Sequence, residues 1–468
     1  YLSIKLFIMK NELLEQIKEI APKLLNLEEL WTQRNQHYHT FLSLGFPNNK
    51  IEQWRQTPID EVMNKDFHYV INNSPIQIEK IQKYLTCTIE NFEKYLFLIH
   101  NGSYIYTDQP IYHDEETGLL AGSLRHAYVL FPEIFNKYFD TIADPTYNGF
   151  VALNMSLASS GFFLYIPAGV KVNIPIQLIN YSDGDNNPFM QSRNIIIIDD
   201  DAEVTFLQCD DTYKANDNSF SNILTEFYLG KNAKLYHYKL QNKSNYSSLI
   251  NTMFFKLKES SFMHSLTLTY NGGFIRNESI IDMDEPGAEA KMFGLGLIDR
   301  TQIIENLAFI HHNAENCNSY QAFKNIIDEK GRGLFNGHIT VMPGAQKTNA
   351  YQIARNILLT SEARVFVKPF LEIYADDVKC SHGSSIGKLD DDALFYLMQR
   401  GICERNAKLL LMYAFTNDIV EEIHIEDLKK QTIGMINRRL NGELTFCDQC
   451  VLGCTKFEIP EIDFETMN

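Results

Sequence analysis

Two sets of side chains in this sequence have the types and spacing needed to bind a metal, and the first is a cysteine–histidine pair. Cys380 and His382 are two residues apart in the stretch DDVKCSHGSSIG, and on a β-strand this spacing places both side chains on one face. A thiolate beside an imidazole suits zinc, copper or iron. Two ligands do not complete a tetrahedral site, so further ligands must come from elsewhere, such as a partner subunit. The alternative is a buried cysteine beside a histidine that only satisfies core hydrogen bonds.

The second set is a cluster of three cysteines near the C-terminus. Cys447, Cys450 and Cys454 occur close together in the stretch ELTFCDQCVLGC. Three thiols at this spacing could hold a soft metal such as iron or zinc with one position open. They could equally be incidental thiols of a terminal tail.

The motifs of the common enzyme classes are missing from the sequence. It contains no nucleophile elbow, Walker A loop, complete dinucleotide-binding fingerprint or H-E-x-x-H zinc motif. His311 and His312 are adjacent, so on a strand they would point to opposite faces and make a poor chelate. Paired carboxylates at 199–201, 376–377 and 390–392 leave a polysaccharide-active β-helix enzyme as an alternative. The first of these sets is more simply a turn and the last a helix N-terminus, and we expect no enzyme.

Charge and composition restrict the partners. The 468 residues carry a formal net charge of −17, with 45% hydrophobic and 22% charged residues, which is typical of a globular chain. The negative charge argues against a nucleic-acid binder and against docking on an anionic membrane, because both need a positive surface. No run reaches the roughly 18 apolar residues of a membrane span, and no secretory signal is recognisable. We therefore expect a cytoplasmic protein with other proteins as partners, whose eight cysteines stay reduced.

Helices are expected at both ends of the chain. Residues 1–94 are predicted to form a helical domain, in which residues 1–8 are a possible upstream extension before Met9. Its apolar residues recur at helical spacing: Leu27, Leu30, Trp31, Tyr38, Phe41 and Leu42. Residues 389–440 are predicted to form a C-terminal helical domain, because LDDDALFYLMQRG has an N-cap aspartate and a stop at Gly401. Residues 441–468 form the cysteine-containing tail.

Between these ends, residues 95–388 are rich in strands and turns. A turn with an acidic residue, Gly or Asn is followed by a small residue and then a strand, at Ala202, Ala233, Ser261, Ala288, Ala314, Ala345 and Ala363. The intervals are 31, 28, 27, 26, 31 and 18 residues. Such a recurrence is typical of stacked coils, each of which buries its inner face against the next. The pattern predicts a mainly β protein with a parallel β-helix, a β-solenoid, as its core. A β-sandwich would give similar strands but no shared turn.

Two stretches of the sequence resemble the SufB/SufD family of iron–sulfur cluster assembly proteins. The long one runs from Gly333 to Ile402. The short one, KIEQWRQTPI at residues 50–59, resembles a Lys-x-Glu-x-Trp-Arg-x-Thr-Pro element typical of the SufD branch, which CSHGSSIG also favours. The resemblance extends from Leu27 to about Ile423 and leaves out the tail cysteines.

The resemblance implies a non-catalytic scaffold with a right-handed parallel β-helix between helical domains. Such a subunit pairs with a SufB-like paralogue through its core and docks a SufC-like ABC ATPase through its C-terminal helices, and a homodimer is possible when it is alone. A nascent iron–sulfur cluster would form transiently at the SufB–SufD interface of the SufBCD complex. His382 is then a candidate ligand with Cys380 beside it, and the isolated chain should hold no tightly bound cofactor.

The helices expected from Asp390 to about Ile423 are unusually apolar. They carry more apolar side chains than a lone surface helix can hide, including Leu409, Leu410, Met412, Tyr413 and Phe415. Part of this surface is therefore expected to bind the ATPase. The alternative function is a metal carrier that uses the tail cysteines: a scaffold would co-purify with an ATPase, whereas a carrier would co-purify with metal alone.

Overall fold

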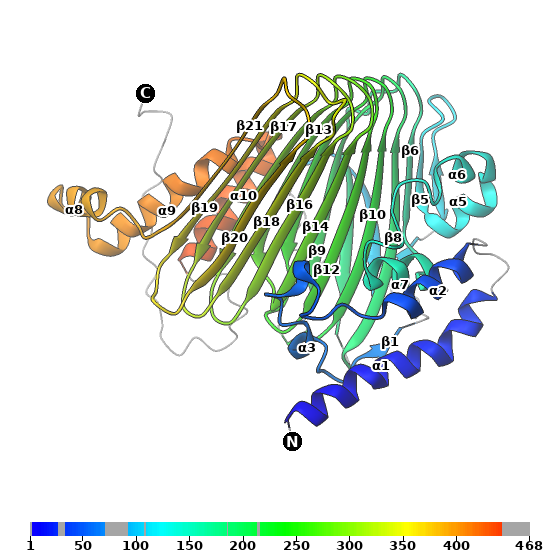
Figure 1. The fold of residues 1–468 in the computed structure, drawn as a ribbon, viewed down its shortest axis with the longest axis horizontal. Coiled ribbons are helices and arrows are strands. Elements are labelled where there is room, and N and C mark those ends of the chain that lie inside the picture. The colour runs from blue at the N-terminus through cyan, green and yellow to red at the C-terminus, as the bar shows by residue number, and fades with distance from the viewer. Residues whose placement is uncertain are drawn as a thin grey trace.

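The chain forms a long β-solenoid with helices on its outer faces (Figure 1). The computed structural model describes residues 2–26, 33–70, 92–106, 109–184, 186–212 and 216–441. The predicted mainly β fold, a solenoid with helical N-terminal and C-terminal regions, is confirmed. Within these ranges, no helix has both the length and the apolar character that crossing a membrane requires.

Two sheets form the solenoid, and successive strands alternate between them. In spatial order, sheet A contains β20 (Arg364–Ile373), β18 (Arg332–Val341), β16 (Ile303–His312), β14 (Phe274–Met283), β12 (Ser248–Leu257), β10 (Phe220–Leu229), β8 (Pro188–Ile198), β6 (Phe162–Ile166), β5 (Leu120–Ser123) and β4 (Ile111–His113), with β1 (His68–Tyr69) beside β8. Sheet B contains β21 (Lys379–Gly387), β19 (Asn349–Leu358), β17 (Asn318–Ile327), β15 (Glu289–Ile298), β13 (Phe262–Asn271), β11 (Lys234–Asn242), β9 (Glu203–Thr212), β7 (Ile176–Ser182), β2 (Tyr95–His100) and β3 (Ser103–Ile105). Neighbouring strands from β6 to β21 pair in parallel, so each coil adds one strand to each sheet.

The turn that leads into each sheet B strand has a recurring backbone shape. The second residue before the strand has a positive φ in six successive coils: Asp201, Asn232, Ser260, Gly287, Asn316 and Lys347. The residue that follows it is small and buried: Ala202, Ala233, Ser261, Ala288, Cys317 and Thr348. The left-handed residue reverses the chain, and the small residue lets the chain enter the interior without a clash.

The predicted small residue before each sheet B strand is correct at the first four positions of the repeat and wrong at the last three. In the fifth and sixth coils, Cys317 and Thr348 occupy the position that Ala202 has in the first coil. Ala314 and Ala345 lie three residues earlier in the same turns. Ala363 comes directly before β20, so it belongs to the opposite side of the solenoid. The error arises because cysteine and threonine are small enough to replace alanine at the bend.

N-terminal helices and a helical insertion cover part of the outer face of sheet A. They are α1 (Leu2–Leu25), α2 (Arg34–Leu44), the 3-10 turn η1 (Glu52–Trp54), α3 (Ile59–Val62), α5 (Leu124–Leu130), α6 (Pro132–Tyr138) and α7 (Gly149–Leu157). Helix α1 runs without a break through Met9. Phe41 and Trp54 pack in one apolar cluster with Phe150 of α7 and Phe220 of β10. Of the apolar positions predicted here, Leu27, Leu30 and Trp31 lie outside the described residues, and Leu42 is exposed.

C-terminal helices cover part of the outer face of sheet B. They are α8 (Asp391–Gln399), α9 (Glu404–Val420) and α10 (Glu426–Leu440). Helices α9 and α10 share an apolar cluster with strands of sheet B, whereas α8 buries none of its residues and projects away from the solenoid (Figure 1). The predicted N-cap is present, since the Asp390 side chain accepts hydrogen bonds from the backbone N–H groups of Asp392 and Ala393.

Candidate functional site

The last coil of the solenoid, residues 364–387, has an unprotected edge on each sheet. No strand within the described ranges pairs with the outer edge of β20 or of β21. Apolar side chains are exposed on and beside these strands, among them Phe370 (51%), Tyr374 (60%) and Ile386 (53%). Unpaired strand edges are templates for pairing with another chain, and parallel sheets are normally covered on both faces. We call this surface the terminal coil and regard it as an interaction surface.

Cys380 and His382 lie on β21, at the edge of the terminal coil. In the pairing with β19, Cys380 lies beside Ala350 and His382 beside Gln352. Ala350 and Gln352 are fully buried, so this side of β19 faces the interior of the solenoid. Side chains of paired strands in register share a face, and Cys380 and His382 therefore lie together on the inward side of β21. Because β21 is the last strand of its sheet, the solenoid leaves this face open at its end.

The two side chains differ in burial and chemistry. Cys380 packs against a small apolar cluster that contains Val341 and Ala345. Burial raises the pKa of the Cys380 thiol above its ordinary value, so at neutral pH the thiol must release a proton before it can bind a metal. His382 is exposed. Within the described part of the chain, no third His, Cys, Asp or Glu completes a close group of ligand atoms with this pair.

The other cysteines and histidines of the sequence analysis are less suited to a site. Cys447, Cys450 and Cys454 lie outside the described residues. His311 and His312 lie on β16 and point to opposite faces: His311 is 2.7 Å from Asp282 at the surface, and His312 is buried. The predicted placement of the two side chains on opposite faces of a strand is therefore confirmed.

Helix α9 uses much of its apolar surface within the chain. Leu409 (8% exposed) and Met412 (7% exposed) are buried in the cluster shared with sheet B, while Leu410, Tyr413 and Phe415 are partly exposed. The ammonium group of Lys324 on β17 donates to the Phe415 carbonyl (2.7 Å). These contacts attach α9 to the solenoid. The large apolar side chains with the greatest exposure in the C-terminal helices are instead on α8: Phe395 (64%), Tyr396 (57%) and Met398 (41%).

The KIEQWRQTPI segment, residues 50–59, is held against sheet A by a buried arginine. The guanidinium carbon of Arg276 lies 3.8 Å from the centre of the Trp54 ring, and the same group donates to Thr57 Oγ1 (3.0 Å) and to the Gln53 carbonyl (3.1 Å). Arg276 also pairs with the carboxylates of Glu278 and Glu305, at 2.6 Å each. Arg276 was not identified from the sequence, because it is separated from Thr57 by 219 residues.

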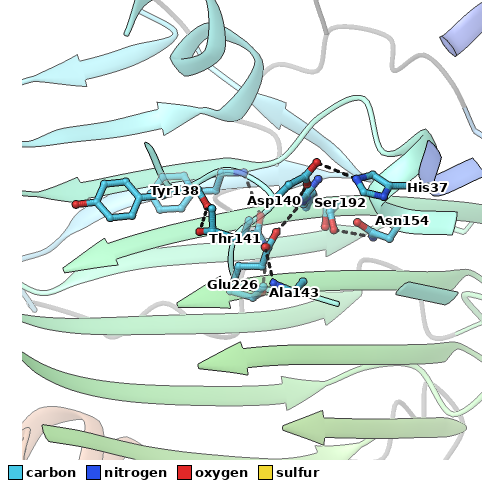
Figure 2. A network of polar contacts seen from close by, with 12 residues as sticks. His37, Tyr138, Asp140, Thr141, Ala143, Asn154, Ser192 and Glu226 are labelled. Atoms are coloured by element: carbon cyan, nitrogen blue, oxygen red, sulfur yellow. Dashed lines mark hydrogen bonds and ion pairs between the residues drawn. The ribbon is translucent and has the colours of Figure 1, made fainter. Parts of the chain in front are cut away.

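A second buried network fastens α2 and the loop after α6 to the solenoid (Figure 2). Arg193 on β8 donates to Glu226 on β10 and to Asp140, both at 2.7 Å, and His37 on α2 lies 2.8 Å from Asp140. Burial alone would raise the pKa of Asp140, but Arg193 and His37 outweigh burial and hold the pKa below its ordinary value. The backbone N–H of Ala143 donates to Glu226 (3.1 Å). The N-terminal region and the solenoid thus share two buried ion networks.

Comparison with known proteins matches almost the whole chain to one family. Residues 180–415 match the family model described as the SufBD core domain of SUF-system FeS cluster assembly, and residues 6–178 match the SufBD protein N-terminal region. The chain is 28% identical over 418 residues to the iron–sulfur cluster assembly protein SufD of Escherichia coli, covering 88% of this chain and 93% of the relative. It is 31% identical over 288 residues to a SufBD family protein of Synechocystis, covering 60% and 64%. It is 29% identical over 293 residues to SufD of Bacillus subtilis, covering 62% and 66%.

Proposed function

The chain belongs to the SufBD family of the SUF iron–sulfur cluster assembly system, and from this premise we propose that it is a non-catalytic scaffold subunit. Its family and its SufD relatives support a role in iron–sulfur cluster assembly. In this proposal the terminal coil pairs with a SufB-like paralogue, the C-terminal helices dock a SufC-like ABC ATPase, and the cluster is a transient cargo at the paired interface.

The observation that carries the pairing is the unprotected terminal coil. Its two open edges and its exposed Phe370, Tyr374 and Ile386 are the features that association with a second solenoid would cover. A paralogue with a similar solenoid could continue both sheets. A specific, stable interface buries roughly 1,200–2,000 Å² in total, which an area the size of this coil can supply.

The ATPase surface is proposed to centre on α8 and the exposed side of α9. Helix α8 has no buried residue, and its Phe395, Tyr396 and Met398 are exposed apolar side chains on a projecting element. Leu410, Tyr413 and Phe415 of α9 are the partly exposed members of the apolar set. Two separate surfaces allow one chain to hold a paralogue and an ATPase at the same time.

His382 and Cys380 are proposed to supply ligands from this chain to the nascent cluster. They share the open face of β21, and no further ligand among the described residues converges on them. The partner would supply the remaining ligands. A neutral imidazole can bind iron without releasing a proton, whereas the Cys380 thiol must first deprotonate, and an adjacent metal ion favours that step.

Two charge substitutions separate the two proposed surfaces. Tyr374→Asp places a carboxylate on the terminal coil, and Phe395→Asp places one on α8. In pull-downs with the tagged chain, Tyr374→Asp should lose the SufB-like paralogue but keep the ATPase, and Phe395→Asp should show the reverse. Binding should fall at least about tenfold, since a buried unpaired charge costs several kcal/mol.

Tyr246→Asp is the matched control, because Tyr246 is also exposed (56%) but lies on a turn before β12. It should retain both partners. Retention of the paralogue by Tyr374→Asp at wild-type levels would disprove pairing through the terminal coil, and loss of both partners from either variant would show that the surfaces are not separate.

A further inference from the structure

Three side chains meet where the α9–α10 turn contacts the solenoid, far from the terminal coil pair. His264 lies on β13, and Glu422 and His424 lie between α9 and α10. Each offers one potential ligand atom, and these three atoms lie within 4.8 Å of one another. Within the described ranges, no other group of three or more His, Cys, Asp or Glu side chains converges in this way.

The buried member of the group lacks hydrogen bonds. His264 is 1% exposed, and neither of its ring nitrogens has a hydrogen-bond partner. Its Nε2 lies 3.6 Å from Oε2 of Glu422, which is too long for a hydrogen bond. Buried polar atoms in native proteins are nearly always satisfied, and a bound ion is one explanation for an exception.

The distances suit a shared cation. Zinc–nitrogen and zinc–oxygen bonds of about 2.0–2.2 Å place two tetrahedral ligand atoms roughly 3.4 Å apart, and the centres of two bound imidazole rings roughly 5 Å apart. The Nε2–Oε2 separation of His264 and Glu422 is 3.6 Å, and the ring centres of His264 and His424 are 4.9 Å apart. Only small side-chain adjustments are therefore needed to place one ion among the three groups.

Neighbouring residues orient the ligands and restrict water. The Tyr238 hydroxyl accepts a hydrogen bond from the backbone N–H of His424 (3.1 Å) and lies 3.3 Å from Nδ1 of the same residue. If Nδ1–H donates to this oxygen, the lone pair of Nε2 is left for a metal, which is the usual outer-shell arrangement of a metal-bound histidine. The rings of Tyr236 and Phe293 flank His264, with centres 6.2 Å and 5.1 Å from it.

The surrounding charges permit a cation. Lys291 lies beside His264 in the β13–β15 pairing, but its ammonium group is 3.1 Å from the carboxylate of Glu289. The ammonium group of Lys291 is thus paired with a carboxylate of its own strand.

We propose that His264, Glu422 and His424 bind one divalent first-row transition-metal ion, zinc or iron(II), which fastens the α9–α10 turn to the solenoid. Two imidazoles and a carboxylate form a ligand set of borderline softness that suits these ions. These three residues supply three ligands, and a water molecule would complete a tetrahedral site. The site does not depend on the proposed scaffold function, since it uses contacts within this chain alone.

Metal binding to the purified chain tests the site. The parent protein for this experiment carries Cys447→Ser, Cys450→Ser and Cys454→Ser, so that the tail thiols cannot contribute. After removal of metal with a chelator, equilibrium dialysis with zinc, and separately with iron(II) without oxygen, should show one tightly bound ion per chain. His424→Ala and Glu422→Gln should each weaken binding by more than about tenfold, because even outer-shell changes cost about 10–100-fold.

The ligand variants are chosen so that they should fold, and a control variant replaces a histidine outside the site. His424 is exposed and Glu422 half-exposed, so both variants should fold, whereas replacement of the buried His264 risks unfolding the chain. His311→Gln removes another histidine that is close to a carboxylate, 2.7 Å from Asp282, and this variant should bind zinc as the parent does. Absence of a tightly bound ion in the parent, or equal affinity in His424→Ala, would overturn the site.

Hydrogen exchange tests the fastening. Zinc should slow amide exchange in residues 421–440 of the parent and leave exchange unchanged in His424→Ala. Binding of an ion without slower exchange in this segment would show that the metal does not fasten the turn.

Discussion

At the scale of single residues, the coil on which a histidine lies decides whether its side chain can bind a partner's metal or is buried in the core. His382 lies at the open end of the solenoid, whereas His312 and His237 lie on inner coils and are fully buried. His312 Nε2 is 2.8 Å from Ser319 Oγ, and His237 Nδ1 is 2.9 Å from Ser265 Oγ. The same residue type therefore serves the core in two places and is available to a partner in the third.

His382→Ala should lower the iron and sulfide recovered with the assembled complex while the chain stays folded. The exposed imidazole makes no buried contact whose loss would destabilise the solenoid, so the melting temperature should change little. Iron per complex and melting temperature are measured on the same sample.

Ser381→Ala is the control for this experiment, because Ser381 is the intervening residue on the opposite face of β21. A destabilised His382→Ala variant with full iron content would instead mean that His382 serves the fold.

At the scale of elements, the 50–59 segment acts as a strap across sheet A. Its Trp54 is 1% exposed, stacks on Phe150 of α7 and lies against Arg276 of β14. Arg332 on β18 donates to the Gln56 carbonyl (3.1 Å). The strap joins the N-terminal helices to several coils, which gives a structural reason for this sequence motif.

Trp54→Ala should destabilise the chain by about 3–5 kcal/mol, the usual cost of truncating a buried large aromatic residue. It also removes the aromatic face that Arg276 contacts. Urea unfolding monitored by circular dichroism measures the change.

Tyr246→Ala provides the comparison, because this exposed aromatic side chain should change stability by no more than about 0.5 kcal/mol. Equal unfolding midpoints for the two variants would mean that the strap adds nothing to the stability of the solenoid.

At the scale of the whole molecule, the solenoid interior keeps histidines uncharged. Burial, with a smaller contribution from Lys239 and His264, lowers the pKa of His237 from 6.5 to about 3. Burial, with a contribution from His311, lowers the pKa of His312 from 6.5 to about 4. In the unfolded chain both histidines take up protons near pH 6.5. Their contribution to the free energy of unfolding is therefore fully present above that pH and is lost as the pH drops toward 3–4.

When the pH is lowered from 7 to 5, each of these two histidines should decrease the free energy of unfolding by about 2 kcal/mol, because one pKa unit corresponds to about 1.4 kcal/mol. The His237→Phe variant should therefore lose about 2 kcal/mol less than the parent over this range. Denaturant titrations at the two pH values measure the difference. The exposed His39→Gln serves as control, and an identical pH dependence in His237→Phe and the parent would contradict the prediction.

The local and repeating features of this protein can be predicted from its sequence. Turn residues that tolerate positive φ, small residues at the bends and strand-forming runs are short-range signals, so the solenoid, the Asp390 cap and the strand position of Cys380 and His382 could be predicted. The family motifs of residues 50–59 and 333–402 were also visible.

The contacts between residues far apart in the sequence are visible only in the folded chain. Arg276 binds the strap from 219 residues away, and His264 meets Glu422 and His424 only because α9 and α10 fold back onto sheet B. The same packing buries Leu409 and Met412, which from the sequence were indistinguishable from a partner surface. A local sequence pattern predicts which residues share one face of a strand or helix. Whether that face is buried depends on which other elements pack against it.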